Sequence, residues 1–110
     1  MIKRLFFDEA YRQAIKSDMN FNHGALVIFR GRIIGRGYNS YIESNYKRSI
    51  HAEERAISDA LKNGMSESEL KKCEMIVIRF NNYGECLNSK PCCNCTNLIN
   101  KYCIKKVYHS

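Results

Sequence analysis

Apolar residues recur along the chain at spacings that separate helices from strands. Near the N-terminus they follow one face of a helix, at Phe7, Ala10, Tyr11, Ala14 and Ile15. Residues 25–29 form a continuous apolar run typical of a buried strand, and residues 33–39 resume strand character after a tight turn near Arg30 and Gly31. These two runs predict a β-hairpin that follows an N-terminal helix.

The middle of the chain predicts a loop and a second helix. Residues 40–49 are polar and aromatic without a clear period, and we expect a loop there. A helix begins at His51 and ends near residues 63–64, with a core face made of Ala52, Ala56, Ala60 and Leu61. Ser66 and Glu69 have the spacing of a capping box, which predicts one further short helical turn.

The last third of the chain predicts a strand, a loop, a helix and a final strand. Residues 75–78 are apolar and strand-like, and residues 81–90 are expected to form a loop. A helix begins near Pro91 and buries the apolar side chains Leu98, Ile99 and Tyr102. Residues 104–108 form the final strand, which should lie parallel to the preceding one because a helix joins the two.

This order of elements fits one α/β domain that spans residues 1–110. A chain of 110 residues can bury a single modest core and is too short for two. The natural architecture is a three-layer α-β-α fold, in which a mixed sheet of four to five strands carries helices on both faces.

Composition bears on where in the cell we expect the protein and on the state of its cysteines. The chain is 45% hydrophobic, yet no apolar run approaches the roughly 20 residues that cross a bilayer, so we expect no contact with a membrane. Lys3 and Arg4 are followed by Asp8 and Glu9 where a secretory signal would have its apolar core, so we expect a cytoplasmic location. Six cysteines in such a chain favour reduced thiols and metal ligation over disulfides.

The charge of the chain favours an anionic partner. A net charge of +7 suits either a nucleotide phosphate or a nucleic acid. The basic residues are spread along the chain with only short clusters, such as Lys47 and Arg48, and scattered charge of this kind also keeps a small protein soluble. Charge alone therefore does not separate a nucleotide enzyme from a nucleic-acid enzyme.

Two short motifs carry the candidate chemistry: His-Ala-Glu at residues 51–53 and Pro-Cys-Cys-Asn-Cys at residues 91–95. The imidazole of His51 and the thiolates of Cys92 and Cys95 are ligands that suit zinc. Three protein ligands leave a fourth position for water, as in catalytic zinc sites, whereas structural sites are usually closed by four.

Helical geometry makes the spacing of these residues reasonable. Cys92 and Cys95 lie three residues apart in the first turn of a helix, so both sulfurs point the same way. His51 begins its own helix, and the partial positive charge of a helix N-terminus favours thiolate over thiol. Glu53 is placed to reach a water in the open position without binding the metal itself.

In these motifs the sequence resembles the cytidine deaminase superfamily, whose signature is H-x-E followed by P-C-x-x-C. The resemblance extends to residues 23–27 and 33–39, which are similar to the first two core strands of that family. Residues 104–108 are similar to the strand after the cysteine helix in deoxycytidylate deaminases. The resemblance implies the cytidine-deaminase-like fold and a zinc-dependent hydrolytic deamination.

The resemblance also implies roles for individual residues. His51, Cys92 and Cys95 would ligate Zn²⁺. Glu53 would take a proton from water, deliver it to the ring nitrogen and help ammonia to depart. Asn39 would hydrogen-bond the sugar.

The remaining implied contacts concern the base and a phosphate. The backbone at Ala52 would help to orient the base, and Lys47 and Arg48 are candidates for a phosphate contact. The implied partner is a small pyrimidine nucleoside or nucleotide, of the dCMP or CMP type. Many members continue beyond the last strand seen here, which implies a compact member whose exposed sheet edge is covered in a homo-oligomer.

Two other functions stay open from the sequence. One is a deaminase of bases in RNA or DNA, and the other is a non-catalytic zinc-binding module in which Cys93 or another group closes the metal site. Cys73 and Cys103 are expected to be buried small hydrophobes, whereas Cys86 has no assigned role. His23 is either a substrate contact or a histidine that ends a strand.

Overall fold

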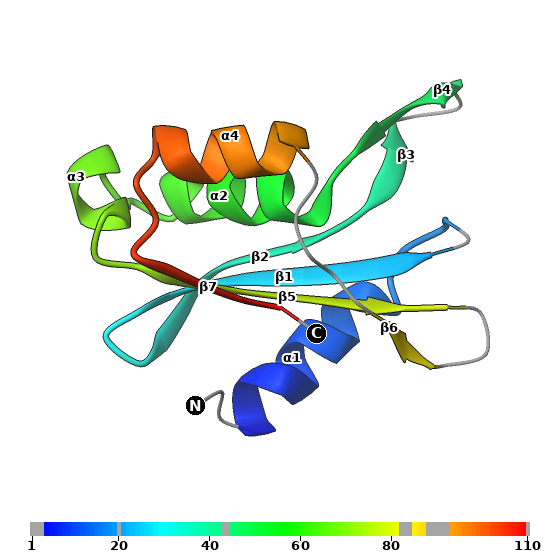
Figure 1. Ribbon diagram of the computed structural model, residues 1–110, viewed down its shortest axis with the longest axis horizontal. Helices are drawn as coiled ribbons and strands as arrows, with labels where there is room; N and C mark the ends of the chain where they lie inside the picture. Colours follow the sequence, from blue (N-terminus) through cyan, green and yellow to red (C-terminus); the bar gives the residue numbers. More distant parts are fainter. Residues whose placement is uncertain (1–3, 20, 43–44, 82–84, 88–92, 110) are drawn as a thin grey trace.

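The structure is a computed structural model that describes residues 4–19, 21–42, 45–81, 85–87 and 93–109, without the side chains of residues 42–49 and 93–95. Its centre is a sheet of five strands (Figure 1). These strands are β1 (Asn22–Phe29), β2 (Arg32–Tyr38), β5 (Glu74–Phe80), β6 (Cys86–Leu87) and β7 (Lys106–His109).

The pairing of these strands is mixed. β1 lies between β2 and β5, and it pairs antiparallel with both. β6 and β7 both pair with the other edge of β5, and only β7 among the described strands runs parallel to its neighbour. The predicted mixed sheet and its parallel final pair are therefore confirmed.

Helices cover both faces of the sheet, as predicted (Figure 1). Helix α1 (Arg4–Ala14) lies on one face. Helices α2 (Ala52–Lys62) and α4 (Cys93–Lys101) lie side by side on the other, and the short α3 (Glu67–Leu70) follows α2. Among the described residues, no helix is long and apolar enough to span a bilayer.

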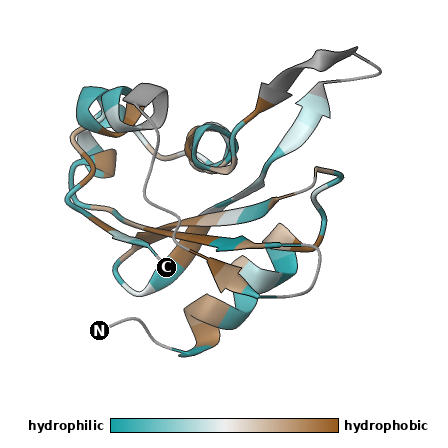
Figure 2. Ribbon diagram, turned by 45° about the vertical axis from the view of Figure 1, so that its right-hand side comes forward, coloured by the Kyte–Doolittle hydropathy of each residue, from teal (hydrophilic) through white to brown (hydrophobic). Residues whose placement is uncertain are grey.

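Side chains of β1 and β5 alternate between two hydrophobic clusters, one on each face of the sheet. Ala25, Val27, Met75 and Val77 pack with residues of α2 and α4. Their chain neighbours Leu26, Ile28, Ile76 and Ile78 pack with α1. Figure 2 shows the hydrophobic residues concentrated along these central strands. Odd-numbered positions of β1 and β5 therefore face α2 and α4.

The predicted N-terminal helix is present, but its predicted buried face is partly wrong. Tyr11 and Ile15 are 40% and 58% exposed, whereas Gln13 is buried with its neighbour Ala14. The cause is close packing against Gly24, because a Cβ there would meet the Ala10 carbonyl oxygen and would lie 2.8 Å from the Ala14 nitrogen. This contact fixes the rotation of α1 about its own axis and leaves Tyr11 at the edge of the interface between helix and sheet.

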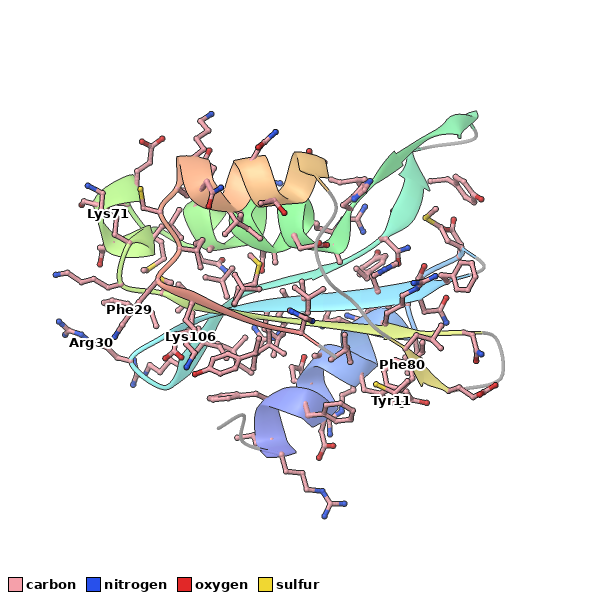
Figure 3. The ribbon with its side chains drawn as sticks, in the orientation of Figure 1. Tyr11, Phe29, Arg30, Lys71, Phe80 and Lys106 are labelled. Carbon is pink, nitrogen blue, oxygen red and sulfur yellow. The ribbon has the colours of Figure 1, made fainter. Side chains whose placement is uncertain are left out.

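Aromatic side chains of α1 pack against Phe80 of β5 at this edge of the interface. The Tyr11 ring meets the Phe80 ring edge to face at a centroid distance of 4.8 Å, and the two lie together below the sheet in Figure 3. Phe7 adds a second edge-to-face contact with Phe80 at 6.3 Å. Such pairs contribute about 0.5–1.5 kcal/mol beyond the area they bury.

The turn between β1 and β2 and the cap of α3 lie where the sequence predicts them. Arg30 and Gly31 have φ values of 51° and 78°, which make the two-residue turn between β1 and β2. Ser66 caps α3, since the Glu69 backbone nitrogen donates to Ser66 Oγ at 3.2 Å and the Glu69 carboxylate accepts from the Ser66 backbone nitrogen at 3.1 Å. The predicted capping box is therefore confirmed.

The predicted loop at residues 40–49 is wrong. This segment contains a second, two-stranded sheet of β3 (Ser40–Ile42) and β4 (Asn45–Ile50), which projects from the main body (Figure 1). Residues 40–49 have no alternation of apolar and polar residues in the sequence, so their pattern did not predict these strands. The predicted loop at residues 81–90 contains the short β6, again without an apolar pattern.

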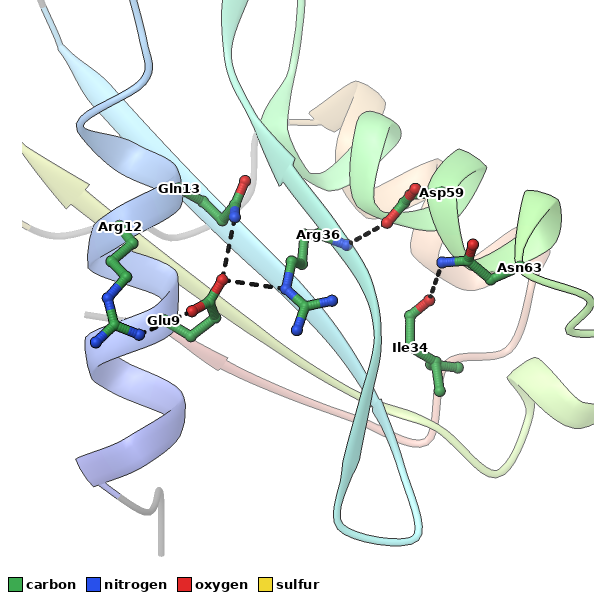
Figure 4. A network of polar contacts seen from close by, with 7 residues as sticks. All are labelled: Glu9, Arg12, Gln13, Ile34, Arg36, Asp59 and Asn63. Carbon is green, nitrogen blue, oxygen red and sulfur yellow. Dashed lines mark hydrogen bonds and ion pairs between the residues drawn. The ribbon is translucent and has the colours of Figure 1, made fainter.

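Two side chains, one from α2 and one from its C-cap residue, hydrogen-bond to backbone groups at the free edge of β2 (Figure 4). The Arg36 backbone nitrogen donates to Asp59 Oδ2 at 2.9 Å, and Asn63 Nδ2 donates to the Ile34 carbonyl oxygen at 2.9 Å. These side chains occupy backbone groups that an edge strand would otherwise offer to another chain.

The side chain of Arg36 connects the same strand to α1. Its Nε donates to Glu9 Oε1 at 3.1 Å, and Glu9 also accepts from Arg12 and Gln13 (Figure 4). Partial burial raises the pKa of Glu9, but the hydrogen bonds from Arg12, Gln13 and Arg36 outweigh it and leave the pKa below its ordinary value. Helices α1 and α2, on opposite faces of the sheet, thus both form hydrogen bonds with Arg36 of β2.

Candidate active site

The N-terminus of α2 holds the His-Ala-Glu motif. His51 is the N-cap residue, with extended backbone angles of φ −81° and ψ 151°, and its side chain makes no capping hydrogen bond. It follows directly on Ile50, the last residue of β4. The predicted start of the helix at this histidine is confirmed, and the positive end of the helix lies beside its imidazole.

Glu53 is buried in the first turn of α2, with 5% of its surface exposed. The next residue, Glu54, is exposed on the other side of the helix. A carboxylate buried so near a helix N-terminus is stabilised by the helix dipole, and burial shields it from bulk water. Glu53 is thus a carboxyl group held out of bulk solvent at the N-terminal end of α2.

A glycine in β2 sets the position of this helix end. A Cβ on Gly37 would meet the Ala52 carbonyl oxygen and would lie 2.5 Å from the Ala56 nitrogen. The backbone of α2 therefore rests directly on the strand, and Ala52 is fully buried. The close approach fixes where His51 and Glu53 sit relative to the sheet.

Helix α4 brings the cysteine motif to the same end of the sheet. Both α2 and α4 begin at this end and run side by side in Figure 1, and Ile57 and Ile99 belong to one core cluster. Cys92 lies outside the described residues. The backbone of Cys95 lies in the first turn of α4, and its side chain is outside the described part of the chain.

The donor types fit zinc at this end of the sheet. No three His, Cys, Asp or Glu side chains within the described residues are grouped to hold a metal, and this set does not include Cys92 and Cys95. The imidazole of His51 and the thiols of Cys92 and Cys95 in the sequence are nevertheless ligands of the types that zinc prefers. Cys93 likewise has no described side chain.

A pocket of about 290 Å³ opens beside the start of β1 and the end of β5. Its described lining residues are Met19, Phe21, His23, Asn39, Tyr41 and Arg79. None of these carries a carboxylate. The pocket thus combines aromatic surface, an amide, an imidazole and a fixed cation.

The side chain of Asn39 contacts three other residues that line this pocket. Its Nδ2 donates to the Phe21 carbonyl oxygen at 2.8 Å and contacts Met19 Sδ at 3.3 Å. Its Oδ1 accepts from the His23 backbone nitrogen at 2.8 Å. Asn39 therefore positions the segment before β1, and its contact with a sugar stays a prediction.

His23 joins the pocket to the N-terminus of α2. Burial, followed by the positive charges of Arg79 and His51, lowers the pKa of His23 to about 4. Its imidazole is therefore neutral near pH 7, and it lies close enough to His51 to be affected by that residue's charge. His23 is a pocket residue as well as the second residue of β1.

Sequence reasoning missed Arg79, Phe21 and Met19 as pocket residues. Arg79 carried a usable signal, because it is a cation within the otherwise apolar run of residues 75–80. A charge at such a position needs a partner or a ligand. Phe21 and Met19 carried no comparable signal, since aromatic and thioether side chains are common in loops and cores.

The predicted phosphate contacts lie in the projecting hairpin. Lys47 and Arg48 belong to β4, and their side chains are outside the described part of the chain. The partner strand β3 carries Tyr41, which lines the pocket. The hairpin therefore adjoins the pocket, and the contacts of Lys47 and Arg48 stay predictions.

The other cysteines divide into one buried and two exposed thiols. Cys73 is fully buried as predicted, and burial, with the neighbouring Glu69 charge, raises its pKa to about 11. Cys103 is exposed, so its predicted burial is wrong: it lies in the turn after α4 with a φ of 54°. Cys86 is exposed in β6.

Comparison with known families gives one match over nearly the whole chain. Residues 2–110 match the family model described as the cytidine and deoxycytidylate deaminase zinc-binding region. A comparison with curated proteins found no match.

Solved structures share the fold at low sequence identity. A dCMP deaminase from the cyanophage S-TIM5, in complex with dCMP and dUMP, is 20% identical with a TM-score of 0.76, covering 99% of this chain and 83% of its own. A cytidine deaminase from Burkholderia pseudomallei is 20% identical with a TM-score of 0.70, covering 90% and 75%. A guanine deaminase from Bacillus subtilis is 21% identical with a TM-score of 0.71, covering 100% and 64%.

Proposed function

Because the chain belongs to the cytidine and deoxycytidylate deaminase family, we propose that it hydrolytically deaminates a pyrimidine nucleotide or nucleoside of the dCMP or CMP type. The observation that carries this proposal is the placement of Glu53. It is a carboxylate buried in the first turn of α2, two residues after His51, at the end of the sheet where the cysteine helix α4 also begins.

His51, Cys92 and Cys95 would hold the metal in this proposal. When bound there, Zn²⁺ supplies a hydroxide near neutral pH by lowering the pKa of water. Two thiolates and an imidazole are donors that suit this cation, and a helix N-terminus favours a nearby thiol in its thiolate form.

Glu53 moves the protons of the reaction. Its carboxylate accepts a proton from the attacking water and delivers it to N3 of the cytosine ring, while a C–O bond forms at C4. It then takes the remaining proton from the new C4 hydroxyl and passes it to the amino group as the C4–N bond breaks and the C4 carbonyl forms. The products are the uracil compound and ammonia. The reaction consumes one water and returns Glu53 to its carboxylate form.

The pocket residues bind and orient the substrate. The Ala52 backbone, at the start of α2, would orient the base, and Asn39 would contact the sugar through the oxygen that also accepts from the His23 backbone nitrogen. A neutral His23 adds no further positive charge beside the base. Lys47 and Arg48 approach a phosphate from the projecting hairpin, and the protein acts as a homo-oligomer.

The experiment that tests this function is a substrate panel with metal control. Ammonia release and ultraviolet change would be followed for cytidine, deoxycytidine, CMP, dCMP, guanine and adenosine, and for a cytosine-containing RNA oligonucleotide. The proposal expects turnover of cytosine nucleotides or nucleosides that is lost on chelation and restored by Zn²⁺. Turnover of RNA alone, or of a purine alone, would overturn it.

A further inference from the structure

Arg55 joins the first turn of α2 to the corner between β2 and β3. Its backbone nitrogen donates to the His51 carbonyl oxygen at 3.1 Å and so closes the helical turn that carries Glu53. Its guanidinium Nη2 donates to Ser40 Oγ at 2.7 Å, and its Cζ lies 4.3 Å from the centre of the Tyr38 ring. One side chain thus contacts both the last residue of β2 and the first residue of β3.

The two residues that this guanidinium contacts are the chain neighbours of Asn39. Asn39 is 6% exposed and lines the pocket, and Ser40 is 9% exposed. A guanidinium can stack through its face and donate through its edge at the same time, so Arg55 restrains the backbone on both sides of Asn39. Among the described residues Arg55 forms no ion pair. Its contacts therefore fix geometry and do not neutralise a carboxylate.

The same contact is connected to His51 through the projecting hairpin. Ser40 pairs with Ile50 in the register of β3 and β4, and Ile50 directly precedes His51. β4 then leads into α2 (Figure 1). The hydrogen bond from Arg55 to Ser40 therefore joins the beginning of the hairpin to the helix that follows its end. Such supporting contacts hold the groups of a site at fixed distances from one another.

Asn39 passes this restraint on to the pocket. Its Oδ1 accepts from the His23 backbone nitrogen at 2.8 Å, and its Nδ2 donates to the Phe21 carbonyl oxygen at 2.8 Å. Both partners line the pocket. A shift of the corner between β2 and β3 would therefore move Asn39 and weaken its hydrogen bond with the His23 backbone.

We infer that Arg55 is a positioning residue, which holds Asn39 at a fixed place relative to Glu53 so that the pocket can meet the sugar of a bound nucleoside. This inference rests on the proposed function for the identity of the ligand, but the positioning itself is a property of the protein alone. It gives a role to a residue that lies outside the described lining of the pocket.

The first test measures amide hydrogen exchange at His23 by NMR in the purified protein with no ligand added. Asn39 Oδ1 accepts from this amide. We therefore expect Arg55→Gln to accelerate its exchange about 3- to 10-fold. Ser40→Ala removes only the hydroxyl acceptor and should accelerate it by a smaller factor. Exchange at Leu26, in the centre of β1, should not change in either variant.

The kinetic test separates KM from kcat. Arg55→Gln should raise KM for deoxycytidine about 10-fold because Asn39 is misplaced, while kcat stays within about 2-fold because Glu53 keeps its place in α2. In an Asn39→Ala background the same substitution should change KM by less than about 2-fold, because the two residues act through one contact. A merely destabilising role for Arg55 predicts no such dependence on Asn39.

Arg12→Gln is the matched control. Arg12 lies on α1, on the other face of the sheet, and its Nη1 donates to Glu9 Oε2 at 3.0 Å. Its replacement removes the same charge and one side-chain hydrogen bond. We expect exchange at His23 and KM for deoxycytidine to stay at their wild-type values. Thermal unfolding would verify that every variant is folded at the temperature of measurement.

Calorimetric binding of deoxyuridine separates this inference from the proposed function. Weaker binding of deoxyuridine by Arg55→Gln than by the wild type, without turnover of any cytosine compound, would overturn the function and support the inference. Deamination with an unchanged KM in Arg55→Gln would overturn the inference and leave the function standing. Unchanged exchange at His23, or a loss that adds fully to that of Asn39→Ala, would have the same consequence.

Discussion

Gly37→Ala is the substitution that most directly tests how β2 positions the catalytic end of α2. The new Cβ would meet the Ala52 carbonyl oxygen and would lie 2.5 Å from the Ala56 nitrogen and 3.0 Å from Arg55 Cβ. The first two are helix backbone atoms, which cannot rotate away as a flexible side chain can. Because ordinary contacts begin at 3.4 Å, the N-terminal turns of α2 must retreat from the sheet by about 1 Å.

The magnitude follows from that displacement. Overpacking of this kind costs about 1–3 kcal/mol of folding stability. A displacement of about 1 Å at catalytic groups can cost about 100-fold in rate. Since Glu53 and His51 move with the first turn of α2, we expect Gly37→Ala to lower kcat for dCMP about 100-fold and to weaken zinc retention.

The assay combines urea unfolding, zinc content and kcat at a temperature where each variant is folded. Leu70→Ala is the control, because Leu70 is a fully buried residue of α3, which follows the opposite end of α2. Its replacement should cost about 2–5 kcal/mol while kcat stays near the wild-type value. A Gly37→Ala protein with wild-type kcat and full zinc content would refute the positioning argument.

Three further predictions concern stability and thiol reactivity. Asp59→Ala removes the acceptor for the Arg36 backbone nitrogen and should lower the free energy of unfolding by about 0.5–1.5 kcal/mol in urea titration; an unchanged midpoint would show that water replaces it fully. The pKa of His23 is about 4 in the folded protein, against 6.5 for an unfolded histidine. Between pH 6.5 and 4 the unfolded chain therefore binds a proton that the folded protein does not bind. The free energy of unfolding should fall as the pH drops through this range. His23→Gln should flatten that slope, measured by urea unfolding across the range, and an unaltered slope would contradict the assignment. Cys73, with its pKa raised to about 11, should alkylate at pH 8 far more slowly than Cys103, as followed by peptide mass spectrometry; equal rates would refute its burial as a neutral thiol.

The elements that sequence predicted correctly depend on local chemistry. The turn at Arg30 and Gly31, the start of α2 at His51 and the capping box of Ser66 and Glu69 each follow from residues next to one another in the chain. The sheet and its layers followed from the order of these elements. The His-Ala-Glu and Pro-Cys-Cys-Asn-Cys motifs likewise indicate the family by themselves.

The features that sequence missed depend on contacts between distant segments. The roll of α1 is set by the approach of Ala10 and Ala14 to Gly24 in another element, so the spacing of apolar residues alone gave the wrong face. The residues of the β3 and β4 hairpin follow no apolar period in the sequence, so no pattern predicted the two strands. Arg79 meets His23 only because of the register between β1 and β5, which no local pattern encodes.

The central claim is that Glu53 performs the proton transfers of a zinc-dependent deamination. The most direct measurement is kcat for dCMP and for deoxycytidine in Glu53→Gln and in Glu54→Gln, with zinc per chain determined in the same samples. Glu54 is the matched control, since it is the exposed neighbour on the same helical turn. The account predicts that Glu53→Gln loses at least about 100-fold in kcat with zinc retained, while Glu54→Gln stays near the wild type. Comparable activity in Glu53→Gln and the wild type would contradict it.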